Sequence, residues 1–125
     1  MTEKPTILCI DDDKTGVNLR KAVLQSAGYS VLTATCGREA IEIIESDSRI
    51  DLVIVDYLMP GMDGTMVAAA IRTSRPKITI LMLTAYVAVP ENAQKWVDHI
   101  MRKGQEPAVF LREVGELLEQ QRPAA

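Results

Sequence analysis

The chain has 125 residues, of which 47% are hydrophobic and 25% are charged, and its formal net charge is −3. These values are typical of one globular domain that can bury its own core, and they give no electrostatic reason to expect binding to nucleic acid. No apolar run approaches the roughly 18 residues of a membrane span, and two cysteines are too few for a disulfide framework, so we expect reduced thiols and a cytoplasmic location.

Short apolar runs alternate with segments of helical periodicity along the chain. The apolar runs, rich in β-branched residues, predict five strands at 6–10, 29–35, 52–55 (ending at Asp56), 78–83 and 99–101. Apolar side chains spaced three and four residues apart predict helices at 15–27, 37–46, 64–74, 90–97 and 107–121. Asp13 is expected to cap the start of the first helix, and Gly28 is expected to cap its end.

This alternation of five strands and five helices predicts an α/β fold. Parallel strands joined by right-handed helical crossovers form a doubly wound sheet, and the strand order 2-1-3-4-5 fits best. In that order the first strand is central and lies beside the strand that ends at Asp56. Ligands and reactive groups of such sheets lie outside the carboxyl ends of the strands.

Polar side chains stand at the carboxyl ends of four predicted strands: Asp11 and Asp12, Asp56, Thr84 and Lys103. Three carboxylates at one edge repel one another unless a cation lies among them. Lys103 supplies one positive charge, so we expect a hard divalent ion, with Mg²⁺ as the cellular default. A metal, a lysine and a hydroxyl beside a carboxylate nucleophile suit phosphoryl transfer, with Asp56 attacking in line.

Each of these residues also has a simpler role available. An aspartate after a strand commonly forms a turn, a threonine can simply end a strand, and a lysine before glycine can be a solvated helix or strand terminus. Their convergence from four strand ends favours a functional site over four separate coincidences.

Three sequence blocks and their order carry a family resemblance: I-L-C-I-D-D-D, D-L-V-I-V-D-Y-L-M-P-G-M-D-G and L-M-L-T-A-Y, followed by Lys103. The chain resembles the CheY-like, flavodoxin-like receiver domain of two-component response regulators over essentially its whole length. The resemblance implies that a histidine kinase or phosphotransfer protein phosphorylates Asp56, and that Thr84 and Lys103 bind the phosphoryl group. It also implies that Asp11, Asp12, Asp56 and the backbone carbonyl of Leu58 hold Mg²⁺.

The resemblance further implies a switch and not a separate enzyme, one that assists only its own phosphorylation and dephosphorylation. Such a domain would signal through the face of the fourth helix, fifth strand and last helix, as a monomer or a phosphorylation-dependent dimer, without nucleic-acid or membrane binding of its own. Residues 1–121 would form the receiver domain, and residues 122–125 would be a tail or the start of a linker. The receiver would be either a stand-alone protein or part of a larger regulator or hybrid kinase.

Several residues depart from the family pattern. Gly104 stands where proline usually follows the lysine, and Ile100 where an aromatic switch residue is common. The segment between Thr84 and Lys103 is short for the family, so we expect a fourth helix that lacks about one turn. We expect Trp96 on that helix, either as a contact of the output face or as core. Leu58 and Tyr86 are expected to shield the phosphoryl group from water and to prolong its lifetime.

Three alternatives remain at this stage. A flavodoxin-like nucleotide binder would share the fold, but the acidic loop after the first strand would repel a phosphate. A phosphohydrolase with an aspartyl nucleophile would need a second acid near Asp56, and neither Tyr57 nor Leu58 supplies one. A receiver-fold interaction module that works without phosphorylation keeps the architecture and loses the switch.

Overall fold

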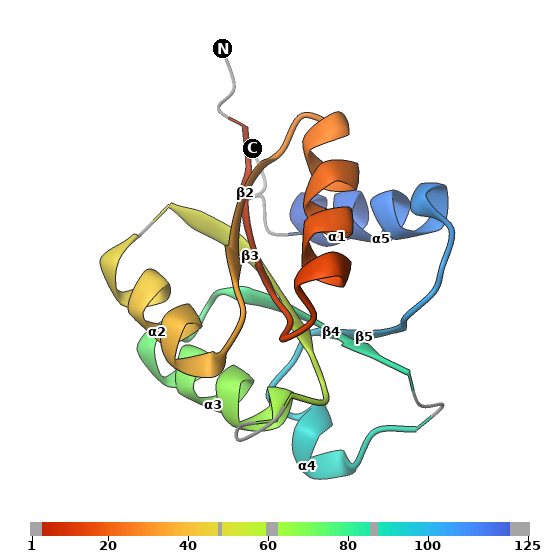
Figure 1. Ribbon diagram of the computed structural model, residues 1–125. Coiled ribbons are helices and arrows are strands. Elements are labelled where there is room, and N and C mark those ends of the chain that lie inside the picture. Colours follow the sequence, from red (N-terminus) through yellow and green to blue (C-terminus); the bar gives the residue numbers. More distant parts are fainter. Residues whose placement is uncertain (1–3, 48, 60–62, 86–87, 121–125) are drawn as a thin grey trace.

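The computed structural model describes residues 4–47, 49–59, 63–85 and 88–120. Its centre is a five-stranded, all-parallel sheet with the order β2-β1-β3-β4-β5 (Figure 1). The strands are β1 (Thr6–Ile10), β2 (Ser30–Ala34), β3 (Ile50–Asp56), β4 (Thr79–Thr84) and β5 (His99–Arg102). The helices are α1 (Lys14–Ser26), α2 (Gly37–Ser46), α3 (Gly64–Ser74), α4 (Glu91–Gln94) and α5 (Pro107–Gln120). The predicted fold class, strand order and five helices are confirmed.

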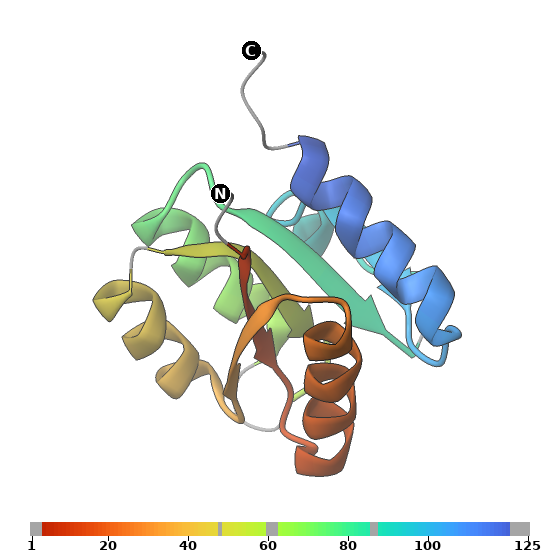
Figure 2. The same cartoon turned by 90° about the horizontal axis from the view of Figure 1, so that it is seen from above.

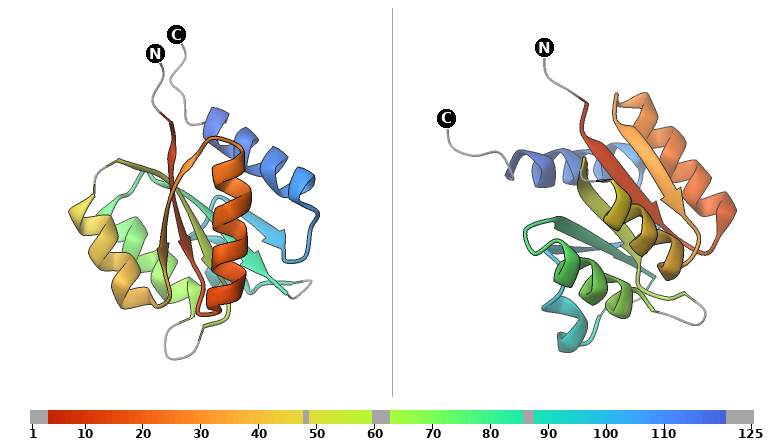
Figure 3. Two further views of the ribbon diagram at one scale, coloured as in Figure 1. Left: turned by 45° about the horizontal axis from the view of Figure 1, so that its top comes forward. Right: turned by 90° about the vertical axis from the view of Figure 1, so that its left-hand side faces the viewer.

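Helices cover both faces of the sheet. Viewed from above, α1 and α5 lie on one side and α2 and α3 on the other (Figure 2). The right-hand view of Figure 3 shows α2, α3 and α4 following one another across the same face. Because both faces are covered, the strands are buried on both sides, which explains their continuous apolar runs. Among the described residues, no helix has the length and hydropathy to cross a membrane.

The core therefore has two layers. Alternate strand residues such as Leu8 and Val53 pack with α2 and α3, and their neighbours such as Cys9 and Ile54 pack with α1 and α5. The centre of the sheet is nearly inaccessible to solvent, so β1 and β3 form a rigid base for the residues at their carboxyl ends.

Helix caps at both ends follow the sequence signals. The side chain of Asp13 accepts a hydrogen bond from the Thr15 N–H at 3.1 Å at the start of α1. At the other end Gly28 has φ +95°, and the Tyr29 N–H donates to the Leu24 carbonyl at 3.2 Å. This is the Schellman arrangement, which favours glycine because the left-handed conformation strains other residues.

The fourth helix, α4, spans Glu91–Gln94 and is thus shorter than the expected 90–97. The chain turns back toward the sheet to form β5, and hydrogen bonds of Asp98 hold this turn in place. Its N–H donates to the Ile80 carbonyl at 2.9 Å, and its carboxylate accepts the Ile80 N–H at 2.8 Å and Arg72 at 2.9 Å. Trp96 consequently lies in the turn after α4 and not on the helix, half-buried against the core.

Candidate functional site

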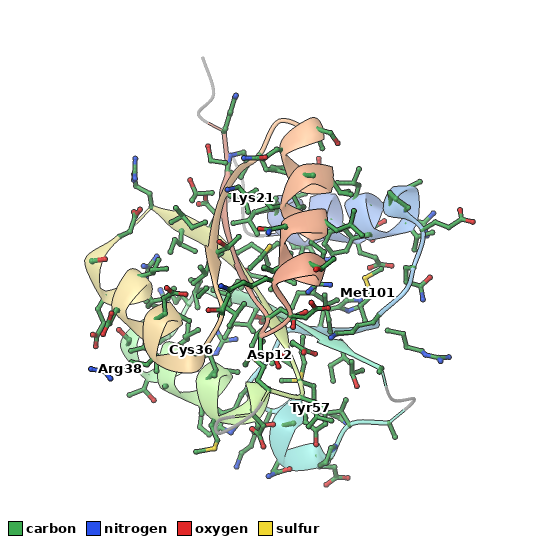
Figure 4. The ribbon with its side chains drawn as sticks, in the orientation of Figure 1. Asp12, Lys21, Cys36, Arg38, Tyr57 and Met101 are labelled. Carbon is green, nitrogen blue, oxygen red and sulfur yellow. The ribbon has the colours of Figure 1, made fainter. Side chains whose placement is uncertain are left out.

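Three carboxylates converge where β1 and β3 end. Asp11 and Asp12 follow β1, and Asp56 is the last residue of β3. Each offers one oxygen such that all three oxygens lie within 4.8 Å of one another. Asp11 and Asp56 are buried, at 1% and 4% exposure, whereas Asp12 is exposed. Figure 4 shows Asp12 and Tyr57, the residue after Asp56, at the same end of the sheet.

Lys103 brings a positive charge into this cluster from the end of β5. Its Nζ lies 3.0 Å from Asp56 Oδ1 and 3.5 Å from Asp11 Oδ2. Its backbone N–H donates to the Thr84 carbonyl at 2.8 Å, which ties the end of β5 to the end of β4. Gly104, with φ +86°, turns the chain directly after the lysine. A glycine in the left-handed conformation therefore makes this turn.

Thr84 is the last residue of β4, at the same edge of the sheet. It is buried, at 1% exposure, and stands beside Arg102 in the register of β4 and β5. The Tyr57 N–H, just past Asp56, donates to the carbonyl of the neighbouring Leu83 at 2.8 Å. The ends of β3, β4 and β5 are thus held to one another by backbone hydrogen bonds.

Of the two residues expected to shield the site, Leu58 lies within the described part of the chain. The side chain of Leu58 is 51% exposed, so it does not form part of the core. Tyr86 lies outside the described residues. The shielding role therefore stays a prediction.

The two buried carboxylates differ in their proton affinity. Burial raises the pKa of Asp56 above its ordinary value, and the negative charge of Asp11 adds to this increase while Lys103 opposes it. Burial also acts on Asp11, but the Asp13 N–H at 3.0 Å and the charges of Arg20 and Lys103 outweigh it and hold the pKa of Asp11 below its ordinary value.

Arg20 is a member of this cluster that the sequence analysis did not predict. Its guanidinium forms a hydrogen-bonded ion pair with Asp11 Oδ2, so the cluster contains two cations and not one. Helical side chains lean toward the amino terminus of their helix. A long basic side chain two turns into α1 can therefore reach back to the residues just before the helix. That position relative to Asp13 is the signal that could have identified it.

Gly64 is a second unpredicted contributor. It opens α3, and its N–H donates to the Tyr57 carbonyl at 2.7 Å. A Cβ at this position would lie 2.3 Å from the backbone oxygen of Asp56 and 2.9 Å from Tyr57 Cα. Helix α3 therefore starts in direct contact with the backbone that carries Asp56.

The donor set suits a hard divalent cation. Carboxylate oxygens are the ligands that Mg²⁺ prefers, and Mg²⁺ commonly uses one or two of them while keeping several waters. Asp12, the exposed member, opens the cluster to solvent, so ions and their waters can reach it. Among the described residues this cluster is made of carboxylates alone, whereas Zn²⁺ or copper would favour sulfur and imidazole ligands.

Comparisons with known proteins agree with this architecture. The family model for the response regulator receiver domain matches residues 7–104. The chain is 33% identical to the transcriptional regulatory protein GlrR of Escherichia coli (strain K12) over 128 residues, covering 99% of this chain and 29% of that protein.

Solved structures agree as well. A CheY-like response regulator receiver domain protein from Methanospirillum hungatei JF-1 matches with TM-score 0.88 and 28% identity, covering 95% of this chain and 97% of its own. The response regulator protein TrrA from Thermotoga maritima, solved in complex with Mg²⁺-BeF, matches with TM-score 0.84 and 33% identity, covering 90% and 98%.

Proposed function

The chain belongs to the response regulator receiver domain family, and from this we propose that it is a phosphoacceptor switch whose acceptor is Asp56. An oxygen of Asp56 attacks the phosphorus of a phosphohistidine, a bond from that oxygen to phosphorus forms, and the bond from phosphorus to the donor imidazole breaks. The donor is a sensor histidine kinase or a histidine phosphotransfer protein. The domain catalyses no reaction on other substrates; it assists only its own phosphorylation and dephosphorylation.

The observation that carries this proposal is the contact between Lys103 Nζ and Asp56 Oδ1, at 3.0 Å, beside the carboxylates of Asp11 and Asp12. A buried carboxylate beside a lysine and a potential metal site is suited to attack phosphorus and to tolerate the added negative charge. The alternative, an interaction module that works without phosphorylation, gives no reason to bury Asp11 and Asp56 together, because that burial costs free energy.

The residues take separate roles in this proposal. Lys103 holds the Asp56 carboxylate before transfer and donates to a phosphoryl oxygen afterwards. The Thr84 hydroxyl donates to another phosphoryl oxygen, and its movement toward that oxygen begins the response. Asp11, Asp12, Asp56 and the Leu58 carbonyl would hold Mg²⁺, which when bound neutralises charge on the phosphoryl oxygens. The relative TrrA was solved with Mg²⁺-BeF, which is consistent with this assignment.

The response is read by another protein. We propose the α4–β5–α5 face as the output surface, with a cytoplasmic location, residues 1–121 as the receiver domain, residues 122–125 as a tail or linker, and a monomer or a phosphorylation-dependent dimer as the assembly. The chain spans 29% of the length of its relative GlrR. Any activity of a longer protein that contains this domain is therefore likewise a proposal.

Phosphorylation by acetyl phosphate with Mg²⁺ tests the proposal, with Asp56→Asn as the variant. Asp63→Asn is the matched control, because Asp63 lies in the same loop and caps α3, and asparagine caps a helix equally well. We expect wild type and the control to gain one phosphoryl group by intact mass spectrometry and Asp56→Asn to gain none. Peptide mapping that places the label on another aspartate would refute the assignment.

A further inference from the structure

Asp11 already has a full set of partners without any metal. Its Oδ2 is bound by the Arg20 guanidinium and lies 3.5 Å from Lys103 Nζ, and its Oδ1 accepts the Asp13 N–H at 3.0 Å. The side chain of Asp11 is only 2% exposed and that of Arg20 is 19% exposed, so water screens this ion pair weakly. The contact therefore differs from a solvated surface pair, which would contribute little.

A divalent cation and the Arg20 guanidinium would compete for the same carboxylate, that of Asp11. A cation bound to Asp11 would lie within a few ångströms of the guanidinium, and like charges at that distance repel strongly in a partly buried site. We propose that Arg20 is an internal counter-cation that occupies Asp11 in the metal-free domain and is displaced from it when the divalent metal binds. This inference rests on the metal site of the proposed function and concerns its regulation by a residue of α1.

The displaced side chain has room to move into. A cavity of about 230 Å³ lies between α1 and the segment that follows β5, and Arg20 itself lines it together with Leu19, Val23, Met101 and Phe110. Most of its lining is apolar, which suits the methylene stem of an arginine whose charged end reaches solvent. A change of the Arg20 rotamer toward this cavity, which Arg102 and Lys103 also line, would release Asp11 without any movement of α1.

Two consequences follow for metal binding. The metal-free cluster is held together by Arg20 and Lys103, so the domain does not depend on a metal to neutralise Asp11. The metal must in turn replace an existing ion pair, so its affinity is lower than the carboxylates alone would give. Phosphorylation then responds to the Mg²⁺ concentration over a higher range than it would without Arg20.

Arg20→Met tests the competition, because methionine removes the charge and still fills an apolar cavity. Lys21→Met is the matched control: it removes the same charge from the adjacent position of α1, and Figure 4 shows Lys21 further along the helix, away from Asp12. Mg²⁺ affinity is measured for the three proteins at one ionic strength by calorimetry, with circular dichroism as the check on folding. One neighbouring charge changes the affinity of a carboxylate for a cation by about ten-fold or more. We expect about ten-fold tighter binding in Arg20→Met and less than about two-fold change in Lys21→Met.

A direct observation of Arg20 in the wild-type domain tests the displacement. The Arg20 side-chain Nε–H resonance is followed by NMR during a Mg²⁺ titration, after assignment with Arg20→Met. We expect it to shift from an ion-paired to a solvated position at the Mg²⁺ concentrations that saturate the site. This measurement does not depend on the variant being stable.

The outcomes are distinguishable. Unchanged or weaker Mg²⁺ binding in Arg20→Met would overturn the competition. Tighter binding with an unmoved Arg20 resonance would overturn the displacement, since charge removal alone would then explain the gain. If none of the three proteins binds Mg²⁺, the metal site of the proposed function is wrong, and this inference is wrong with it.

Discussion

The contact between α3 and the Asp56 backbone leads to a quantitative prediction for Gly64→Ala. The added Cβ would lie 2.3 Å from the Asp56 carbonyl oxygen, a backbone atom that cannot move by a rotamer change. Relief requires the start of α3 to shift by about an ångström, which would also break or lengthen the 2.7 Å hydrogen bond from the Gly64 N–H to the Tyr57 carbonyl. Overpacking of this kind costs about 1–3 kcal/mol.

In a domain of this size that loss corresponds to a fall in Tm of about 4–12 °C. Gly115→Ala is the matched control, because Gly115 lies within α5 and its new Cβ would meet only the Tyr29 hydroxyl, at 3.8 Å. The same substitution there should stabilise the domain by about 1 kcal/mol, since alanine favours a helix over glycine. The two variants are therefore expected to move Tm in opposite directions.

Calorimetry and urea unfolding measure both variants, and the rate of phosphorylation by acetyl phosphate reports on Asp56. Because the shift acts on Asp56, the proposed phosphoacceptor, we expect Gly64→Ala to lower that rate by up to about 100-fold. A Gly64→Ala protein as stable and as reactive as wild type, beside a stabilised Gly115→Ala, would show that α3 does not constrain Asp56.

Three further predictions concern the metal, the thiols and the tryptophan. Mg²⁺ should raise Tm by linkage and chelation should reverse this increase; a Tm that does not change with Mg²⁺ would contradict the metal site. Asp12→Ala should not lower the Tm of the metal-free domain, because it removes an exposed like charge from the cluster. Cys9 is buried and burial raises its pKa to about 12, so only the exposed Cys36 should react with Ellman's reagent in the native state. From about pH 9 upward the unfolded chain loses the Cys9 thiol proton that the folded chain keeps, so the free energy of unfolding should fall. A native protein in which both thiols react rapidly would show that Cys9 is not buried. Trp96→Ala should cost about half of the roughly 3–5 kcal/mol of a fully buried tryptophan, because Trp96 is half-buried against the core, and a larger loss by urea unfolding would show that it belongs to the core proper.

The fold was predictable because its signals are local. Each strand is an apolar run, each helix has an apolar stripe, and residues such as Asp13 and Gly28 mark helix ends by their own backbone chemistry. The placement of Asp11, Asp56, Thr84 and Lys103 at one edge of the sheet was also predictable, because the carboxyl ends of parallel strands lie at the same edge.

The remaining features depend on contacts between distant segments. The requirement for glycine at position 64 comes from how closely α3 approaches β3, and the period of apolar residues contains no information on that distance. The spacing of Thr84 and Lys103 predicted a short fourth helix, but the end of α4 at Gln94 depends on the contacts of Asp98 with Ile80 and Arg72, which lie on other elements. Trp96 was expected on the fourth helix because the helical pattern of the sequence continues to Val97. The helix in fact ends at Gln94, since the chain turns there to reach β4 at Asp98.

Arg20 changes the physical argument for the metal. The sequence alone suggested too few cations, since three carboxylates faced only Lys103, and a divalent ion was inferred to balance them. With Arg20 bound to Asp11, two cations face three carboxylates, so the cluster has a net charge of one negative unit. Water can solvate that charge at the exposed Asp12. The charge balance alone therefore no longer requires a metal. The argument for Mg²⁺ therefore rests on the oxygen donors and on the proposed phosphoryl transfer, which would add negative charge beside Asp56. On that proposal the metal would be needed most at the transfer step and least in the resting domain.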